Sequence, residues 1–212
     1  YVSSLARGIF AILSHVSEAS AVEHAQVALK VLDGIPAAIA GGTAGQLHRM
    51  PFITPRNSGY QRSETEVLVA RDALSHFGRR LPHVIVRPGE ELPHDIVMVN
   101  GIPTTSLLHT AVDLVRMGLR PQRAARARSL PLPEALVVLD SVARRLSDVD
   151  SGEAQARFTA IRPRFRQAQG IRAFDAAVSF VDPRAESPLE SLSRVYMVVF
   201  GVPTPLLQQV LV

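Results

Sequence analysis

The sequence predicts an α/β (α+β) fold in which a small mixed-sheet domain is followed by a helical segment. Two short runs rich in β-branched residues, 83–86 and 95–99, flank a Pro88-Gly89 turn and are typical of strands. Apolar residues recur at helical spacing over 22–32, and the chain reads as helices from residue 134 to 200. The 212 residues are 47% hydrophobic, so the chain can build a proper core.

The first elements are a helix and a glycine-rich turn. The helix spans 22–32 and stops at Asp33-Gly34. A short apolar stretch then leads to Gly41-Gly42, and a helix starts at Thr43 and continues to about Met50. The glycine pair either forms a tight turn or cradles a phosphate at the helix start.

The next part of the chain mixes strands and helices. We expect a short strand at 51–55 and an amphipathic helix over 64–76. The strands at 83–86 and 95–99 are consistent with an antiparallel pair, and Asn100-Gly101 ends the second one. A further helix spans 107–117, and its N-cap is either of two hydroxyl residues, Thr105 or Ser106.

The second half is helical. It contains expected helices at 134–146, 153–168, 171–180 and 187–200, followed by "TPLLQQVLV", which resembles a first strand. Pro131 and Pro133 mark the best domain boundary. The sequence therefore predicts three parts, which are an α/β domain at 1–130, a helical connector at 131–180 and the start of another domain at 181–212.

Composition excludes several classes of protein. The chain has no cysteine, so disulfides and thiolate metal sites are excluded, and the seven histidines lack the spacing of a zinc site. No run of 18 apolar residues exists, and the first 20 residues do not form a secretory signal. We therefore expect a cytoplasmic protein without a membrane partner, a cofactor or a bound metal.

Two stretches of the chain are rich in arginine and contain no acidic residue. Residues 116–128 and residues 157–172 hold five arginines each. Arginine pairs with phosphate oxygens bidentately, so both stretches are candidates for binding the DNA backbone; otherwise they are solvated faces of helices and loops. The predicted DNA contacts are Arg116, Arg120, Arg123, Arg126, Arg128, Arg162, Arg164 and Arg166.

A possible triad on the expected 107–117 helix is set aside. Ser106, His109 and Asp113 share one helix face, but one helix cannot supply a mutually oriented nucleophile, base and oxyanion donor. Cap and surface roles are expected for them. Asp113 and Asp140 are expected to make structural hydrogen bonds.

Three segments resemble one family. "VNGIPTTSLLHTAVDLVR", "ALVVLDSVARRL" and "DPRAESPLESLSRV" with "GVPTPLLQQV" are similar to the actinobacterial AbiEi-like antitoxins, which are regulators of type IV toxin–antitoxin systems. The resemblance implies a winged helix-turn-helix upstream, DNA and a cognate toxin as partners, and a restriction-endonuclease-like domain, related to very-short-patch repair enzymes, that starts at 181–212 and is truncated. Tyr1 in place of methionine and the apparent strand at 204–212 lead us to expect that the natural protein extends beyond both ends.

Glu186 and Glu190 are the candidates for a nuclease-type site. Four residues apart, they share one side of a helix, and the resemblance implies that one of them is the helix carboxylate of a PD-(D/E)xK site that would hold Mg²⁺. The alternative is a capping box in which Ser187 is the N-cap and Glu190 reaches back to it. Arg184 and Arg194 are then available to pair with the glutamates.

Three functions remain open. The first is a DNA-associated transcriptional regulator or antitoxin that is not catalytic over these residues. The second is a metal-dependent endonuclease whose catalytic strands lie beyond residue 212. The third is a scaffold whose apolar run at 196–202 is a protein interface, and a homodimer is compatible with any of the three.

Overall fold

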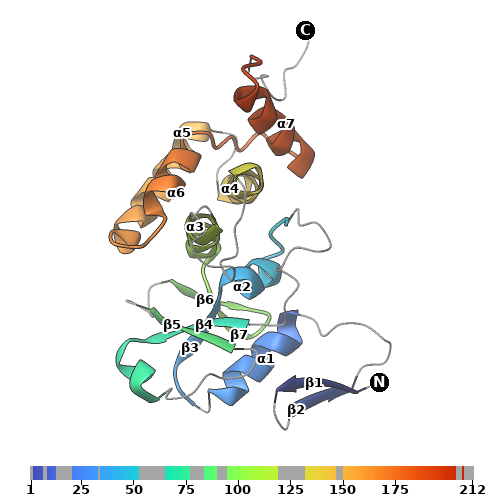
Figure 1. Ribbon diagram of the computed structural model, residues 1–212, viewed down its shortest axis with the longest axis vertical. Helices are drawn as coiled ribbons and strands as arrows, with labels where there is room; N and C mark the ends of the chain where they lie inside the picture. Colours follow the sequence, from blue (N-terminus) through green and yellow to red (C-terminus); the bar gives the residue numbers. More distant parts are fainter. Residues whose placement is uncertain are drawn as a thin grey trace. The chain divides into compact units, whose positions relative to one another are not determined.

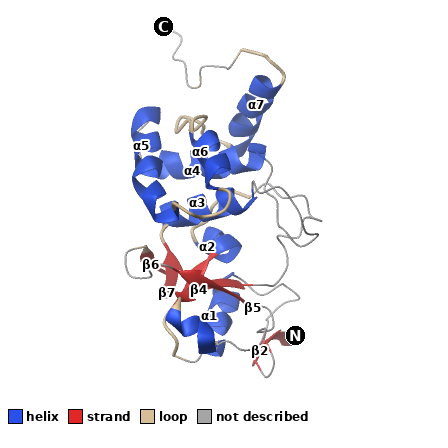
Figure 2. Cartoon of the chain, turned by 60° about the vertical axis from the view of Figure 1, so that its left-hand side comes forward, coloured by secondary structure: helices blue, strands red, loops and turns tan. Residues whose placement is uncertain are grey.

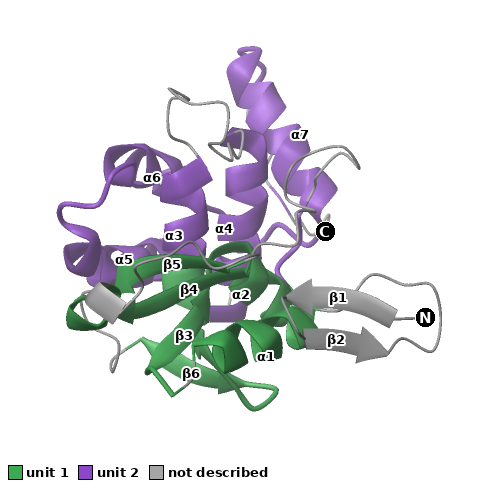
Figure 3. Cartoon of the chain, turned by 60° about the horizontal axis from the view of Figure 1, so that its bottom comes forward, with its two compact units in different colours: residues 1–49, 60–110 green, residues 50–59, 111–212 purple. Residues whose placement is uncertain are grey.

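The computed structural model divides the chain into two compact units, residues 1–49 with 60–110 and residues 50–59 with 111–212 (Figure 3). The first boundary that was predicted, at residue 130, therefore lies downstream of the observed change of unit at 110. The structure describes residues 2–6, 9–12, 21–32, 34–52, 65–76, 84–89, 95–118, 132–146, 150–203 and 207.

The first unit holds two sheets (Figure 1). A hairpin of β1 (Val2–Ala6) and β2 (Ile9–Ile12) forms the smaller one. The larger is a mixed, five-stranded sheet with the order β5-β4-β3-β7-β6. Its strands are β3 (Ala37–Ala40), β4 (Thr65–Ala70), β5 (Val84–Gly89), β6 (Ile96–Val99) and β7 (Ile102–Thr105). The predicted mixed α/β class is thus confirmed.

The pairing of strands differs from the predicted one. β4 pairs parallel to β5, β3 pairs antiparallel to β4 and parallel to β7, and β6 pairs antiparallel to β7. The predicted antiparallel pair of 83–86 and 95–99 is therefore wrong, because these strands lie at opposite edges of the sheet. Asn100 and Gly101 have φ values of 51° and 75°, and they close the two-residue hairpin between β6 and β7.

The predicted helix over 64–76 is also wrong. Residues 65–70 form strand β4 between β3 and β5, and only Asp72–His76 follows as the 3₁₀-helix η2. β4 is central, so Val67, Leu68 and Val69 are all buried and the strand does not alternate between buried and exposed residues. Without that alternation, Val67, Ala70 and Leu74 matched the spacing of a helix by coincidence.

Two short helices complete the first unit. Their bounds are α1 (Ala21–Val31) and α2 (Gly41–Leu47). Both pack with the central strands in one apolar core, and the alanines of α1 and α2 let helix and sheet backbones approach each other closely. The core contains Ala25, Ala28, Leu32, Ile39, Ala44, Leu47, Val67, Val69, Val84 and Ile102.

In the part of the second unit that the structure describes, every regular element is a helix (Figure 2). Helix α3 (Leu107–Gly118) crosses from the first unit into the second. The elements that follow are α4 (Leu132–Leu146), α5 (Ser151–Ile161), the 3₁₀-helix η3 (Arg162–Phe165), α6 (Ile171–Val178) and α7 (Pro188–Val199). All four helices predicted for this half are confirmed, with an interruption at η3.

Helix α4 is the centre of the helical unit. It contacts α5, α6 and α7, and eight of its residues between Ala135 and Ala143 are buried, with Ser141 as the interruption. Phe158 of α5 and Phe174 of α6 meet edge to face with ring centroids 6.0 Å apart. Because α7 packs on α4, the predicted parts 131–180 and 181–212 belong to one compact unit.

Two predictions fall partly or wholly outside this description. Pro51 and Phe52 are not in a strand, and the rest of the expected strand at 51–55 lies outside the described residues. The expected strand at 204–212 also lies outside them, apart from Leu207. Among the helices that are described, none combines the length and the apolar character needed to cross a membrane.

Candidate functional site

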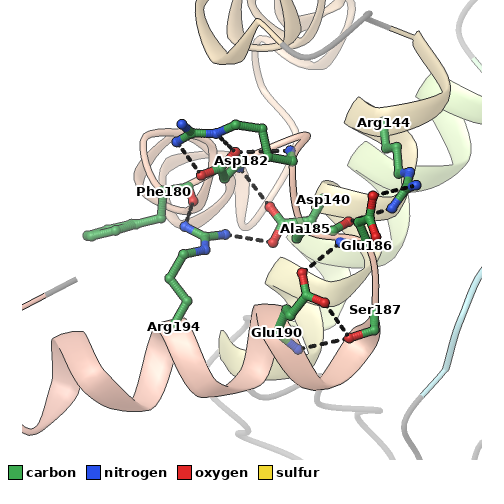
Figure 4. A network of polar contacts seen from close by, with 10 residues as sticks. Asp140, Arg144, Phe180, Asp182, Ala185, Glu186, Ser187, Glu190 and Arg194 are labelled. Atoms are coloured by element: carbon green, nitrogen blue, oxygen red, sulfur yellow. Dashed lines mark hydrogen bonds and ion pairs between the residues drawn. The ribbon is translucent and has the colours of Figure 1, made fainter. Parts of the chain in front are cut away.

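A buried ion pair joins α4 to α7. The Arg194 guanidinium donates through one terminal nitrogen to Asp140 Oδ2 at 2.6 Å and through the other to the backbone oxygen of Phe180 (Figure 4). Arg194 is 6% exposed and Asp140 is 1% exposed. Removing one partner would leave a buried charge uncompensated, so this pair is a structural element of the helical unit.

The second carboxylate oxygen of Asp140 also accepts a hydrogen bond. Asp140 Oδ1 accepts the Asp182 backbone N–H at 2.9 Å. Burial raises the pKa of the Asp140 carboxyl, and this rise is opposed by the Arg194 charge, the Asp182 amide and the Ser191 hydroxyl. The carboxylate therefore fixes both α7 and the segment that precedes it, which agrees with the structural hydrogen bonds expected for Asp140.

Asp182 forms the second half of the network. Its two carboxylate oxygens accept from Arg184 Nε at 2.9 Å and from a terminal Arg184 nitrogen at 2.8 Å, in the bidentate geometry that guanidinium favours. Burial acts to raise the pKa of Asp182, but the hydrogen bonds and charge of Arg184, with the charge of Arg194, lower it below its ordinary value.

Glu190 is engaged in capping α7. Ser187 is the N-cap, and its hydroxyl oxygen accepts the Glu190 N–H at 3.3 Å, while Pro188 occupies the first turn. Glu190 Oε2 accepts the Glu186 N–H at 2.9 Å, and Oε1 accepts the Ser187 hydroxyl at 3.2 Å. The predicted capping box is confirmed, with the glutamate reaching one residue further back than the usual box.

The two glutamates do not form a shared carboxylate site. Glu186 is exposed and pairs with Arg144 at 3.4 Å, whereas Glu190 is turned toward the helix start. The prediction that Arg184 and Arg194 pair with these glutamates is wrong, because both arginines pair with aspartates instead. Within the described ranges no group of three His, Cys, Asp or Glu side chains could hold a metal ion.

Arg116 of the first arginine-rich stretch points into the protein. A terminal nitrogen of its guanidinium donates to Asp113 Oδ1 at 2.5 Å, the other donates to the backbone oxygen of Gln169 at 3.3 Å, and the guanidinium carbon lies 5.5 Å from the centre of the Phe165 ring. The structure thus gives the Arg116 guanidinium partners within the protein, and its predicted phosphate contact stays a prediction. The remaining arginines of this stretch lie outside the described residues, namely Arg120, Arg123, Arg126 and Arg128.

In the second stretch, Arg162 and Arg157 form ion pairs with carboxylates. Arg162 donates to both oxygens of Asp175 at 3.2 and 3.0 Å, and this hydrogen bonding raises its pKa further. Arg157 pairs with Glu153 at 2.9 Å. The stretch is thus acid-free only in sequence, since Glu153 and Asp175 supply carboxylates from outside it. Arg164 and Arg166 are exposed at η3 and just after it.

The last turn of α3 lies against the turn that precedes α6. Gly170 has a φ of 82°, and a Cβ at this position would lie 1.9 Å from the backbone oxygen of Arg116. Only glycine permits both this backbone conformation and this close approach. Together with the Arg116–Gln169 hydrogen bond, the contact places the last turn of α3 against the turn that follows Arg166, and Arg120 comes two residues after the end of α3.

The glycine pair at the start of α2 is not a phosphate cradle. A Cβ on Gly41, which has a φ of 58°, would lie 2.6 and 2.7 Å from the two carboxylate oxygens of Glu66. The anion at this helix start is thus the Glu66 side chain of β4, and Arg87 of β5 pairs with it at 3.2 Å. Gly41 is explained by the alternative of a tight turn, because its positive φ and the nearby Glu66 carboxylate leave no room for a side chain.

The residues near the start of α3 have structural roles. The Ser106 hydroxyl accepts the His109 N–H at 3.2 Å, so Ser106 is the N-cap and Thr105 is not. His109 Nδ1 lies 3.2 Å from Asp95 Oδ2, while Asp113 pairs with Arg116. The cap role of Ser106 agrees with the sequence prediction, whereas the expected surface role is wrong for Asp113, which is buried.

The outer face of α7 is apolar. Its side chains are exposed, in agreement with the idea that the 196–202 run is not core, and the Tyr196 and Phe200 rings stack with centroids 6.3 Å apart. Arg194 is the single charged residue between Glu190 and Val212, and it is buried. The exposed apolar residues are Leu189, Tyr196, Val198, Val199, Phe200 and Val202.

Sequence reasoning missed the role of Arg194 and of Arg116. The partners of Arg194 lie 54 and 14 residues away, so no local spacing reveals them. A usable signal did exist, because a lone charge within an uncharged stretch, opposite an aspartate inside the apolar run "ALVVLD", is typical of a buried ion pair.

Comparison with known proteins adds a distant relationship. The chain is 30% identical over 149 residues to an uncharacterised protein that is found in two strains of Mycobacterium tuberculosis. The match covers 68% of this chain and 47% of the relative, so the chain spans about half the length of the curated relatives it matches. No family model matches. No solved structure matches either.

Proposed function

We propose that this chain belongs to a DNA-associated regulator of the antitoxin type and contacts the DNA backbone through arginines of its helical unit. The observation that carries the proposal is the contact between Arg116, the first arginine of one stretch, and the turn at 169–170 within the other. Arg164 and Arg166 are exposed next to this junction, and four further arginines follow α3 in the sequence.

The chemistry favours phosphate over other ligands. Several guanidinium groups within one region neutralise neighbouring phosphates and release counterions, which gives affinity without reading the bases. We therefore propose that these arginines position the protein on DNA, and that another part of the protein selects the DNA sequence. Arg162 takes no part in it, because its guanidinium is held by both oxygens of Asp175.

The nuclease alternative receives no support from the glutamates in this chain. Glu190 uses both carboxylate oxygens in hydrogen bonds at the start of α7, and Glu186 pairs with Arg144. An endonuclease-like continuation beyond residue 212 stays a prediction.

The test is duplex binding by charge-matched variants. We expect Arg164→Ala with Arg166→Ala to weaken binding to a fluorescent duplex equally for unrelated sequences, as phosphate contacts do. The control, Arg144→Ala with Arg157→Ala, removes the same formal charge from arginines already paired with glutamates, and we expect it to bind within about twofold of the parent. Equal losses in both double variants would show a response to net charge alone and would contradict the proposal.

A further inference from the structure

We propose that strand β6 binds β6 of a second copy of this chain, so that the sheet continues across a two-fold axis into a dimer. β6 is the last strand in the order β5-β4-β3-β7-β6, so only one of its two sides pairs with a neighbour in the sheet. A strand in that position offers backbone donors and acceptors to another extended chain. The interface lies in the first unit alone and does not depend on DNA binding.

The pairing of β6 with β7 determines which backbone groups of β6 point outward. The Asp95 backbone oxygen accepts the Ser106 N–H at 2.6 Å, so Asp95 turns its backbone groups toward β7. Because hydrogen-bonded and non-hydrogen-bonded pairs alternate in an antiparallel ladder, the residues turned away from β7 are Ile96 and Met98. Within the described ranges, the outward backbone groups of these two residues have no hydrogen-bond partner.

The side chains of β6 suit an apolar partner strand. Val97 is 40% exposed and Met98 is 66% exposed, and as neighbours in a strand they point to opposite faces of the sheet. β6 contains neither a charged residue nor a proline, which are the residues that protect many open edges from pairing. β5, the strand at the other edge, contains Arg87 and Pro88. The edge that lacks such protection is therefore β6.

The register of β6 favours a second copy over an unrelated peptide. Two antiparallel β6 strands related by an axis at Val97 place Ile96 opposite the partner subunit's Met98, and Met98 opposite the partner subunit's Ile96. These are the residues with outward backbone groups, so each pair exchanges both of its hydrogen bonds. Only apolar side chains meet across the axis, and no like charges oppose each other. The same strand is thus its own complement, as a two-fold interface requires.

The oligomeric state and its response to charge test the interface. A strand of four residues makes a small interface, so we expect a weak dimer with a Kd on the order of 10 µM. Sedimentation equilibrium from well below to well above this concentration measures the dimer, and a parent that stays monomeric throughout overturns the inference. Val97→Lys places two ammonium groups opposite each other at the axis and should weaken the dimer at least about tenfold.

The matched control is the same substitution on the apolar face of α7. Val199 is 63% exposed, and Val199→Lys should leave the Kd within about twofold of the parent value. Urea unfolding of both lysine variants verifies that the samples compared are folded. If Val199→Lys abolishes the dimer and Val97→Lys does not, the dimer forms through α7 and the inference is overturned.

Cross-linking tests the register itself. The chain has no cysteine, so Val97→Cys supplies the single thiol of each copy. Opposite residues of a non-hydrogen-bonded pair have Cα atoms about 4.5 Å apart, within reach of a disulfide. With oxidised glutathione, Val97→Cys should form a covalent dimer at least about tenfold faster than Met98→Cys, whose thiol lies opposite the partner subunit's Ile96. Equal rates for these two variants, or a rate for Val97→Cys no higher than that of Val199→Cys, would overturn the inference.

Discussion

Arginine has opposite roles in two parts of the helical unit. Between α4 and α7, Arg194 is buried and held by Asp140 and the Phe180 carbonyl. Around η3, Arg164 and Arg166 are exposed. The same side chain is thus buried inside the fold in one place, where it holds two helices together, and exposed at the surface in the other.

Arg116 shows why arginine counts along the chain are a poor guide to binding. It opens an acid-free stretch of five arginines, yet its partners are Asp113, three residues before it, and a carbonyl 53 residues after it. Charge density in the sequence marks a region of interest, whereas the distribution of carboxylates in space identifies which guanidinium groups can reach phosphate.

Among the tests of this contrast, removing the buried arginine should change the free energy of unfolding most. Arg194→Ala should lower the free energy of unfolding by about 3–5 kcal/mol, because Asp140 is left charged, buried and without its partner. Arg166→Ala, an exposed arginine of the same unit, should change it by less than about 0.5 kcal/mol. Urea unfolding of both variants at neutral pH measures the difference. Equal, small losses would mean that burial does not separate the two roles.

The contact between Gly170 and the Arg116 carbonyl can be tested by adding a Cβ to the glycine. Gly170→Ala should destabilise the unit by about 2–3 kcal/mol, because the new Cβ meets the Arg116 carbonyl and the backbone has a positive φ. Gly201→Ala is the matched control, since Gly201 has a φ of 69° with nothing within 4 Å, and its loss should be about 1 kcal/mol. Thermal or urea unfolding should resolve the two. Losses of the same size would show that the contact with α3 contributes nothing.

The smallest expected effect concerns the start of α7. Ser187→Ala should cost about 1 kcal/mol of stability, the usual value of an N-cap hydroxyl, because the Glu190 N–H loses its acceptor. Ser193→Ala, at an exposed position within the same helix, should be neutral or slightly stabilising, because alanine is the better helix former. A neutral Ser187→Ala would show that the Ser187 hydroxyl does not contribute to the start of α7.

Local patterns were predictable from the sequence, and distant contacts were not. The helices of the second half, the Ser187–Glu190 cap and the Asn100-Gly101 turn follow from spacings of a few residues. Strand β4 was missed because a central strand buries both faces and loses its alternation. Strand β7 was missed because Pro103 argues against a strand with neighbours on both sides, although β7 lies between β3 and β6.

In the candidate site too, local features could be predicted from the sequence and distant contacts could not. The arginines of 157–172 could be proposed from composition alone, and the Arg157–Glu153 pair is an i,i+4 contact within one helix, but the pairing of Arg162 with Asp175 required the fold. The Asp140–Arg194 pair and the Arg116–Gln169 contact join residues more than 50 positions apart. Such contacts follow from the packing of α4 on α7 and of α3 on the turn before α6, which no spacing along one segment encodes.

The salt dependence of duplex binding tests the central claim most directly. The slope of log affinity against log salt is measured for the parent, for Arg164→Ala with Arg166→Ala, and for the triple change of Arg123, Arg126 and Arg128 to alanine. We expect a steep fall with salt for the parent, and a slope reduced by roughly 0.9 for each arginine removed, so that both stretches contribute. Binding that does not respond to salt, or a slope that neither set of substitutions alters, would contradict the account.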